Sequence, residues 1–237
     1  MKRRREMEME VRETEMRSAI EELSVLVKLN QKNSTPAAHV IGSEIHQQEV
    51  AVSSIPTKPF LSLCYCLLQV LDKIGPTMAV LRQDVYKNIQ RLEMVCESDP
   101  TYSNLVEIIK KEAVERNAKK SDSCSRALVW LTRSLDFTGA LLERIAMNPR
   151  GSMEQMVADS YEITLKPWHG WISAAAYKVA LKLVPDSNTF INLLMAKGQD
   201  MKTLQDEINA LLSLLLPLLQ DTHSLLRSYG LEKFKST

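Results

Sequence analysis

The sequence predicts an all-α protein, a globule of about eight helices of ordinary length. Three observations favour this fold class. Apolar residues make up 45% of the 237 residues but aromatic residues only 5%, so the apolar side chains are mainly aliphatic, which suits helices. Only seven glycines are present, whereas barrels and dinucleotide-binding folds need glycine at turns and phosphate loops. Finally, apolar residues recur at the spacing of one helix face along most of the chain.

The first section of the chain, residues 1–30, is strongly charged and carries one apolar stripe at helical spacing. This pattern predicts a charged N-terminal helix. The stripe consists of Met16, Ile20, Leu23 and Val27. Residues 31–58 contain serine and proline clusters that break any periodicity, which is typical of a flexible linker. We therefore expect the compact domain to span residues 59–237.

From Pro59 onward every segment has helical character and no segment indicates a strand. The first helix of this part, residues 60–80, is nearly all apolar and is expected to be buried. Asp99 and Pro100 have the pattern of an N-cap followed by a first-turn proline, so a helix should begin there. The remaining helices are expected at residues 84–96, 121–147, from 152, 167–183, 187–198 and from 201.

Local signals also define several helix ends. Polar residues that can cap a helix N-terminus precede three of the expected helices. The candidate caps are Ser121, Asp122 or Ser123 for the first, Ser152 for the second, and Asp186 or Ser187 for the third. Pro217 is expected to kink or end the last helix, because proline removes a backbone hydrogen bond.

Charge and cysteine content narrow the function classes. Thirty basic residues against twenty-nine acidic ones give a net charge of +1, which argues against a strongly basic nucleic-acid binder. No stretch of about 18 consecutive apolar residues is present, so no membrane-spanning helix is expected. Four cysteines in 237 residues do not make a disulfide scaffold. We therefore expect a reduced, cytoplasmic protein that does not bind nucleic acid.

Motifs of catalysis are absent from the sequence. It contains no G-x-S-x-G elbow, no H-E-x-x-H motif and no glycine-rich phosphate loop. The four histidines lack metal-ligand spacing with a cysteine or with one another. We therefore expect neither an enzyme nor a bound metal or cofactor.

One polar row stands out beside the apolar face of an expected helix. Asp84, Asn88 and Arg91 follow i, i+4, i+7 spacing, which places them on one face. A carboxylate, an amide and a forked cation in one row can bind a polyhydroxyl group. The alternative is a surface network in which the three side chains satisfy one another.

Trp130 lies at helical spacing from Phe137. A tryptophan in such a position is usually part of the core. Its flat face can also stack against a sugar, whose axial C–H bonds pack on an aromatic ring. Both interpretations remain open at this stage.

A second aromatic stretch, Trp168 to Trp171, places a glycine inside an expected helix. Glycine costs about 1 kcal/mol there relative to alanine, so a close approach of another group to Gly170 is one explanation. Successive helical residues differ by about 100°, so His169 can face inward while Trp171 faces outward. An outward tryptophan near Lys178 and Lys182 suits a membrane interface. A buried histidine with a wedged tryptophan is the alternative.

These residues fall in four ordered blocks that resemble the glycolipid transfer protein family, in particular plant members with an N-terminal extension. The resemblance spans roughly residues 55–237. The blocks are Pro59-Phe60 leading to residues 71–75, residues 82–93, residues 128–137, and residues 161–171 continuing to Pro185. The resemblance implies a two-layer helical sandwich that moves sphingolipids between membranes. No bond is broken in such transfer, so no catalytic residue is required.

The resemblance also implies a head-group site. Asp84 would accept hydrogen bonds from a sugar hydroxyl and from the ceramide amide N–H, and Asn88 would bond further hydroxyls. Arg91 stands where the family often has lysine, and its fork changes the donor geometry. Trp130 would stack on the first sugar. His169 would donate to the ceramide acyl carbonyl.

Other positions match the family's apolar chamber and its membrane contact. The chamber and its portal would be lined by Leu81, Phe137, Leu165, Tyr177 and Phe190. Trp171 matches the tryptophan that docks on the membrane, where Lys178 and Lys182 would accompany it. The implied partners are a glycosphingolipid and, transiently, a membrane surface, and we expect the protein to be a monomer.

The type of head group separates two branches of this family. The branch that binds ceramide-1-phosphate carries a lysine and an arginine where this chain has Asn88 and Trp130, which favours a neutral sugar, as in glucosylceramide or galactosylceramide. Arg126 and Arg133 lie on the helix of Trp130 and keep the phosphate alternative open. The extension of residues 1–58 raises a third possibility, a lipid-sensing helical interaction module.

Overall fold

A computed structural model describes residues 14–33 and 54–236 of the protein. This part of the chain forms nine α-helices and three short 3-10 turns, and it contains no strand beyond one isolated bridge between Pro56 and Asn104. The prediction of an all-α fold is confirmed. The helices are α1 (Glu15–Asn33), α2 (Thr57–Ile74), α3 (Ala79–Ser98), α4 (Leu105–Val114), α5 (Cys124–Met147), α6 (Met153–Thr164), α7 (Trp171–Leu181), α8 (Ser187–Leu194) and α9 (Met201–Ser228).

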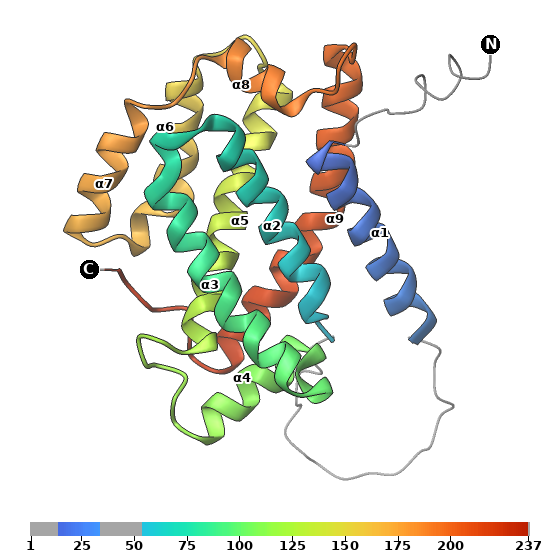
Figure 1. The fold of residues 1–237 in the computed structure, drawn as a ribbon, viewed down its shortest axis with the longest axis vertical. Helices are drawn as coiled ribbons and strands as arrows, with labels where there is room; N and C mark the ends of the chain where they lie inside the picture. The colour runs from blue at the N-terminus through green and yellow to red at the C-terminus, as the bar shows by residue number, and fades with distance from the viewer. Residues whose placement is uncertain (1–13, 34–53, 237) are drawn as a thin grey trace, which may run out of the picture.

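The longest helices pack in two layers (Figure 1). In one layer α2 lies between α1 and α3, and in the other α5 lies between α6 and α9. The layers meet where α3 packs on α5 and where α1 packs on α9. The shorter helices lie at the margins, with α4 against α5, α7 against α6 and α8 against α2. The predicted two-layer helical sandwich is therefore confirmed.

The expected N-caps hold at three helix starts. Side-chain oxygens of Ser123, Ser152 and Asp186 accept hydrogen bonds from backbone N–H groups in the first turns of α5, α6 and α8. Asp99 also acts as a cap, but the segment that it opens is a 3-10 turn, Pro100–Ser103. The α-helix that follows has its own cap in Asn104.

Glycine and proline account for most of the incorrect helix boundaries. The expected helix at residues 60–80 is interrupted at Gly75, whose φ of 102° ends α2 in a conformation that other residues rarely adopt. Gly170 lies at the N-terminus of α7 and not inside a helix, because Pro167 lies in a separate 3-10 turn, Lys166–Trp168, and His169 is extended. Pro217 lies within α9, which continues to Ser228, and α8 ends at Leu194, before Gly198.

The N-terminal helix is packed on the rest of the protein. Met16, Ala19 and Leu23 are buried and Ile20 is half-buried, as expected for the stripe, while the side chain of Val27 lies outside the described residues. The described helix runs from residue 15 to 33, and residues 1–13 of the expected N-terminal helix lie outside the described residues. Of the segment expected as a linker, residues 34–53 lie outside the described residues.

The residues just before position 59 also pack against the rest of the protein. Ile55 and Thr57 are both buried, and the backbone carbonyl of Ile55 accepts a hydrogen bond of 2.9 Å from the N–H of Leu105. Pro59 therefore lies inside the first turn of α2, a place that tolerates proline because the N–H there has no helical partner.

Two further features bear on the class of protein. Within the described ranges, no helix is long and apolar enough to cross a membrane. All four cysteines are free, with Cys64, Cys96 and Cys124 buried and Cys66 half-buried.

Candidate functional site

A cavity of about 1030 Å³ lies between the two helical layers. Its volume reaches the upper end of the range for small-molecule sites, which is about 300–1,000 Å³. All ten residues predicted for the head-group site, the chamber and the portal line it, and they come from four helices and the segment between α6 and α7. They are Leu81, Asp84, Asn88, Arg91, Trp130, Phe137, Leu165, His169, Tyr177 and Phe190.

The polar row of α3 lies at this cavity and is only partly satisfied by its own members. The side-chain amide of Asn88 donates to the backbone carbonyl of Asp84 at 3.0 Å. Arg91 donates to the side-chain oxygen of Asn88 and to the carbonyl of Ser121, both at 3.4 Å. Within the described part of the chain, the carboxylate of Asp84 forms no hydrogen bond or ion pair. Both oxygens of the Asp84 carboxylate therefore remain available to accept hydrogen bonds from a ligand.

His169 contributes a second polar group to the cavity. It lies in extended backbone between a 3-10 turn and α7, with its N–H bonded to the carbonyl of Leu165 at 3.1 Å. Its Nδ1 atom is buried and has no hydrogen-bond partner among the described residues. Burial, aided by the charge of Arg133, lowers the pKa of His169. The ring is therefore neutral at pH 7, with one donor and one acceptor nitrogen.

Tyr161 is a site residue that the sequence reasoning missed. Its hydroxyl is buried without a hydrogen-bond partner in the described part of the chain, and the residue lines the cavity. Its ring stacks on that of Tyr177, with centroids 3.4 Å apart and planes within 4°, and lies 5.4 Å from the ring of His169. A buried hydroxyl without a partner is costly, so Tyr161 and His169 together offer two unpaired polar atoms to a ligand.

Trp130 forms one side of a stack that holds Arg133. The Arg133 guanidinium lies 4.8 Å from the ring centroid of Trp130 and 4.2 Å from that of Trp168, and the residue is 3% exposed. It donates to the carbonyls of Glu232 at 2.7 Å and Phe234 at 2.8 Å. Burial lowers its pKa to about 10, so it stays charged at neutral pH. Arg133 thus binds the C-terminal tail and, unlike Arg126, does not line the cavity.

The C-terminal tail connects α5 to the segment that carries His169. The Ser236 N–H donates to the carbonyl of Trp168 at 2.9 Å, and the N–H of Gly170 donates to the Ser236 hydroxyl at 3.1 Å. Ser236 also lines the cavity. These contacts fix the backbone on both sides of His169. No local sequence pattern could predict these contacts, because the residues that they join are about 66 positions apart in the chain.

Helix α7 presents an exposed apolar face next to the cavity mouth. No residue of α7 is buried, and Trp171 is 80% exposed. Ile172 and Val179 are exposed as well, and so are Lys178 and Lys182. Val179 lines the cavity, whereas Trp171 and the two lysines do not. An apolar patch accompanied by lysines is typical of surfaces that contact a partner or a membrane.

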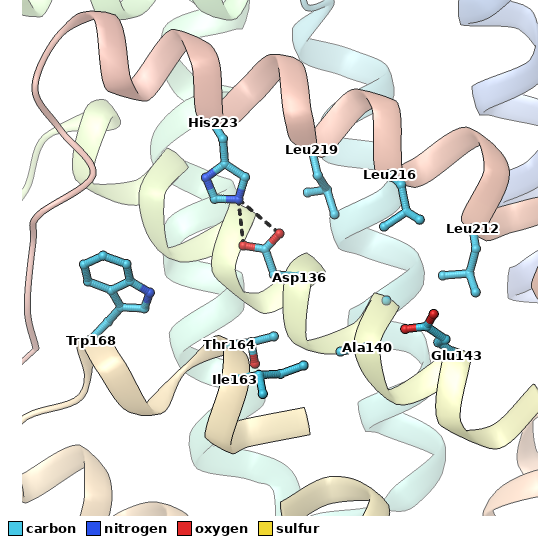
Figure 2. Close-up of a pocket in the computed structure, with 11 residues that line it drawn as sticks. Asp136, Ala140, Glu143, Ile163, Thr164, Trp168, Leu212, Leu216, Leu219 and His223 are labelled. Atoms are coloured by element: carbon cyan, nitrogen blue, oxygen red, sulfur yellow. Dashed lines mark hydrogen bonds and ion pairs between the residues drawn. The ribbon is translucent and has the colours of Figure 1, made fainter. Parts of the chain in front are cut away.

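A second, smaller cavity of about 390 Å³ lies between α5, α6 and α9 (Figure 2). Its polar element is the pair of Asp136 on α5 and His223 on α9, whose Nε2 lies 2.9 and 3.1 Å from the two carboxylate oxygens. The Nδ1 atom of His223 lies 3.9 Å from the carboxylate of Glu232 in the C-terminal tail. His223 has no role predicted from the sequence, and in the structure it links α9 to α5.

Raising the pH is expected to weaken this link. The hydrogen bond to Asp136 raises the pKa of His223. A raised folded-state pKa means that the stabilisation is complete below the unfolded pKa of about 6.5 and is lost as the pH rises through the folded value. The Tm of the wild type should therefore fall further between about pH 6 and about pH 9 than that of His223→Gln. An equal fall in both proteins contradicts this assignment.

The fold and the cavity define the class of protein. An all-helical sandwich that encloses an apolar chamber, with unpaired polar atoms at one side and an exposed apolar helix beside them, has the architecture of a carrier for an amphipathic lipid. The sequence matches the family described as Glycolipid transfer protein (GLTP) over residues 55–196. The chain belongs to this family.

Three similar proteins illustrate the relationship. Glycolipid transfer protein 3 of Arabidopsis thaliana is 54% identical over 224 residues, which cover 94% of this chain and 92% of the relative. A solved structure concerned with how FAPP2 selects simple glycosphingolipids is 26% identical, with a TM-score of 0.70 and coverage of 79% and 92%. Arabidopsis accelerated-cell-death 11 bound to ceramide-1-phosphate is 18% identical, with a TM-score of 0.75 and coverage of 93% and 98%; this likeness concerns the fold alone.

Proposed function

We propose that the protein transfers glycosphingolipids of the glucosylceramide or galactosylceramide type between membranes, without catalysis. The observation that carries the proposal is the convergence of the polar row of α3, Trp130 and His169 on one apolar cavity. The protein would act as a monomer in the cytoplasm and contact membrane surfaces only transiently.

The physics of transfer explains this arrangement. A hydrocarbon chain that leaves a bilayer for water loses about 0.8 kcal/mol per methylene group, so a carrier must offer a dry chamber of matching capacity. The leucines, valines and isoleucines of α2, α5 and α9 supply it. At the polar side, an unpaired buried group costs roughly 1–3 kcal/mol, which selects a lipid that carries the complementary amide and hydroxyls.

Each polar residue then has a defined task. The free carboxylate of Asp84 accepts from a sugar hydroxyl and from the ceramide amide N–H. Asn88 and Arg91 bond further hydroxyls, and Trp130 stacks on the first sugar. Neutral His169 donates to the acyl carbonyl through one of its ring nitrogens. We add Tyr161 to this set, because its buried hydroxyl has no partner in the described residues.

Ceramide-1-phosphate is the second candidate ligand, and the arginines bear on it. A phosphate needs several cations around it. Arg126 lines the cavity, but its guanidinium also contacts the Phe234 ring and the carbonyl of Lys235. Arg133 is committed to the C-terminal tail. With Asn88 and Trp130 at the positions where the phosphate-binding branch has cations, the site favours a neutral sugar.

A vesicle assay tests the proposal. Donor vesicles hold a labelled glycolipid, either glucosylceramide or galactosylceramide, and acceptor vesicles hold none. The protein should raise the rate of transfer well above the spontaneous rate. No increase contradicts transfer and leaves the lipid-sensing module as the alternative, provided that the protein still binds the lipid. Faster movement of labelled ceramide-1-phosphate than of the glycolipid favours the second candidate.

The membrane contact has its own test. Replacing Trp171 with alanine should weaken partitioning to vesicles, because an exposed tryptophan ring favours the interface between membrane and water. The substitution should not disturb the core, since Trp171 is 80% exposed. We expect about a fivefold loss or more in the partition coefficient, while lipid affinity in detergent stays unchanged. Trp171→Phe, which keeps an aromatic ring, is the matched control. Equal partitioning of the alanine variant and the wild type argues against a docking role.

A further inference from the structure

Helix α1 forms part of the wall of the large cavity. Glu15, Met16 and Ala19 line it, and Met16 and Ala19 are buried. Helix α1 thus does more than pack on α2 and α9, because it also borders the cavity. The family match covers residues 55–196, so this wall comes from outside the matched segment.

The wall lies at the end of the cavity opposite the head-group residues. The polar row is on α3, and α2 separates α3 from α1 within the layer. Figure 1 shows the same order, with α7 and α3 toward one side and α9 and α1 toward the other. Two helix spacings of about 8–10 Å each therefore separate the polar row from α1. A hydrocarbon chain that enters beside α3 and runs between the layers ends at α1.

Two ion pairs hold the first turn of α1 in this position. Lys73 of α2 donates to the carboxylate of Glu15 at 2.6 Å and to the backbone carbonyl of Leu193 at 3.3 Å. Arg17 donates to the carboxylate of Glu207 on α9, also at 2.6 Å. These ion pairs attach α1 to both layers. The side chain of Ala19, which lines the cavity, is small. A larger residue at this position would fill part of the cavity.

We infer that α1 sets the length of the hydrocarbon chain that the protein accepts, with Met16 and Ala19 as the stop for the far end of the longer chain. The inference rests on the proposed function. Filling the space at Ala19 should exclude long chains and spare short ones, because a short chain does not reach α1. Specificity of this kind is a difference between two affinities, so it is measured as a ratio.

The first test measures that ratio for Ala19→Trp. Glucosylceramides with acyl chains of about eight and about twenty-four carbons differ enough in length to separate the two ends of the chamber. The ratio of long-chain to short-chain transfer should fall about tenfold or more relative to the wild type. Ser18→Trp, on the exposed side of the same helix, should keep the wild-type ratio. An unchanged ratio in Ala19→Trp with short-chain transfer intact overturns the inference.

A second measurement uses the unmodified full chain and does not depend on the folding of a variant. A long-chain glucosylceramide with a photoreactive diazirine at the end of its acyl chain is loaded, irradiated and located by peptide mapping. We expect labelling of the tryptic peptides that contain Met16 and Ala19. Labelling confined to α5, α8 or α9 overturns the inference while leaving the proposed function intact. Absence of transfer for both chain lengths in the wild type overturns the proposed function, and the inference with it.

Discussion

Replacing Asp84 with valine is expected to abolish glycolipid transfer while the protein remains helical. The Asp84 carboxylate lies at the cavity and forms no hydrogen bond or ion pair within the described residues, so its loss breaks no contact of the fold. In the complex, the ceramide amide and a sugar hydroxyl would both lose their acceptor. Each unpaired group costs roughly 1–3 kcal/mol, and the two together correspond to a loss of about a hundredfold or more in transfer.

The neighbouring residue supplies the control. Gln83 is exposed, lies on the same helix and does not line the cavity, so Gln83→Val introduces the same β-branched side chain into α3 without touching the site. This variant should transfer at the wild-type rate. Circular dichroism should give the same helical content for both variants. Retained transfer in Asp84→Val would remove Asp84 from the head-group site.

The sequence could predict those parts of the site in which the relative positions of the residues depend on a single helix. Asp84, Asn88 and Arg91 share a face because the helical period alone places them there. N-caps such as Ser123 and Ser152 depend on a side chain and a backbone group three residues apart, so they too are local. The grouping of Asp84 with Trp130 and His169 depends on how three segments pack, and it was available only through resemblance to a family.

The features that escaped prediction are fixed by long-range packing. In the sequence, Arg133 kept the phosphate alternative open, whereas in the structure it lies between two tryptophans and donates to the carbonyls of a distant tail. The unpaired state of the Tyr161 hydroxyl is a property of its neighbours and leaves no trace in local spacing. The position of Gly170 relative to α7 was also not predicted, because a glycine inside a helix and a glycine at the N-terminus of a helix have similar sequence surroundings.

Replacing Trp130 is also expected to lower glycolipid transfer strongly, and its variants separate recognition of the sugar from recognition of ceramide. Trp130→Ala removes the aromatic face on which the sugar would stack, so transfer of glucosylceramide should fall about tenfold or more. Short-chain ceramide without a sugar should bind Trp130→Ala and the wild type nearly equally, since Asp84 and His169 still meet the amide and the carbonyl.

Trp130→Phe tests whether the aromatic face itself matters. The phenyl ring keeps a flat surface for the sugar and for the Arg133 guanidinium, which lies 4.8 Å from the Trp130 centroid. This variant should retain most of the glucosylceramide transfer. Arg133 keeps its two carbonyl partners in both variants, so the tail should stay attached in both. Tm should fall further in Trp130→Ala, which also loses the ring that packs against Arg133. Equal loss of ceramide and glucosylceramide binding in Trp130→Ala would show that Trp130 supports the structure of the site and does not recognise the sugar.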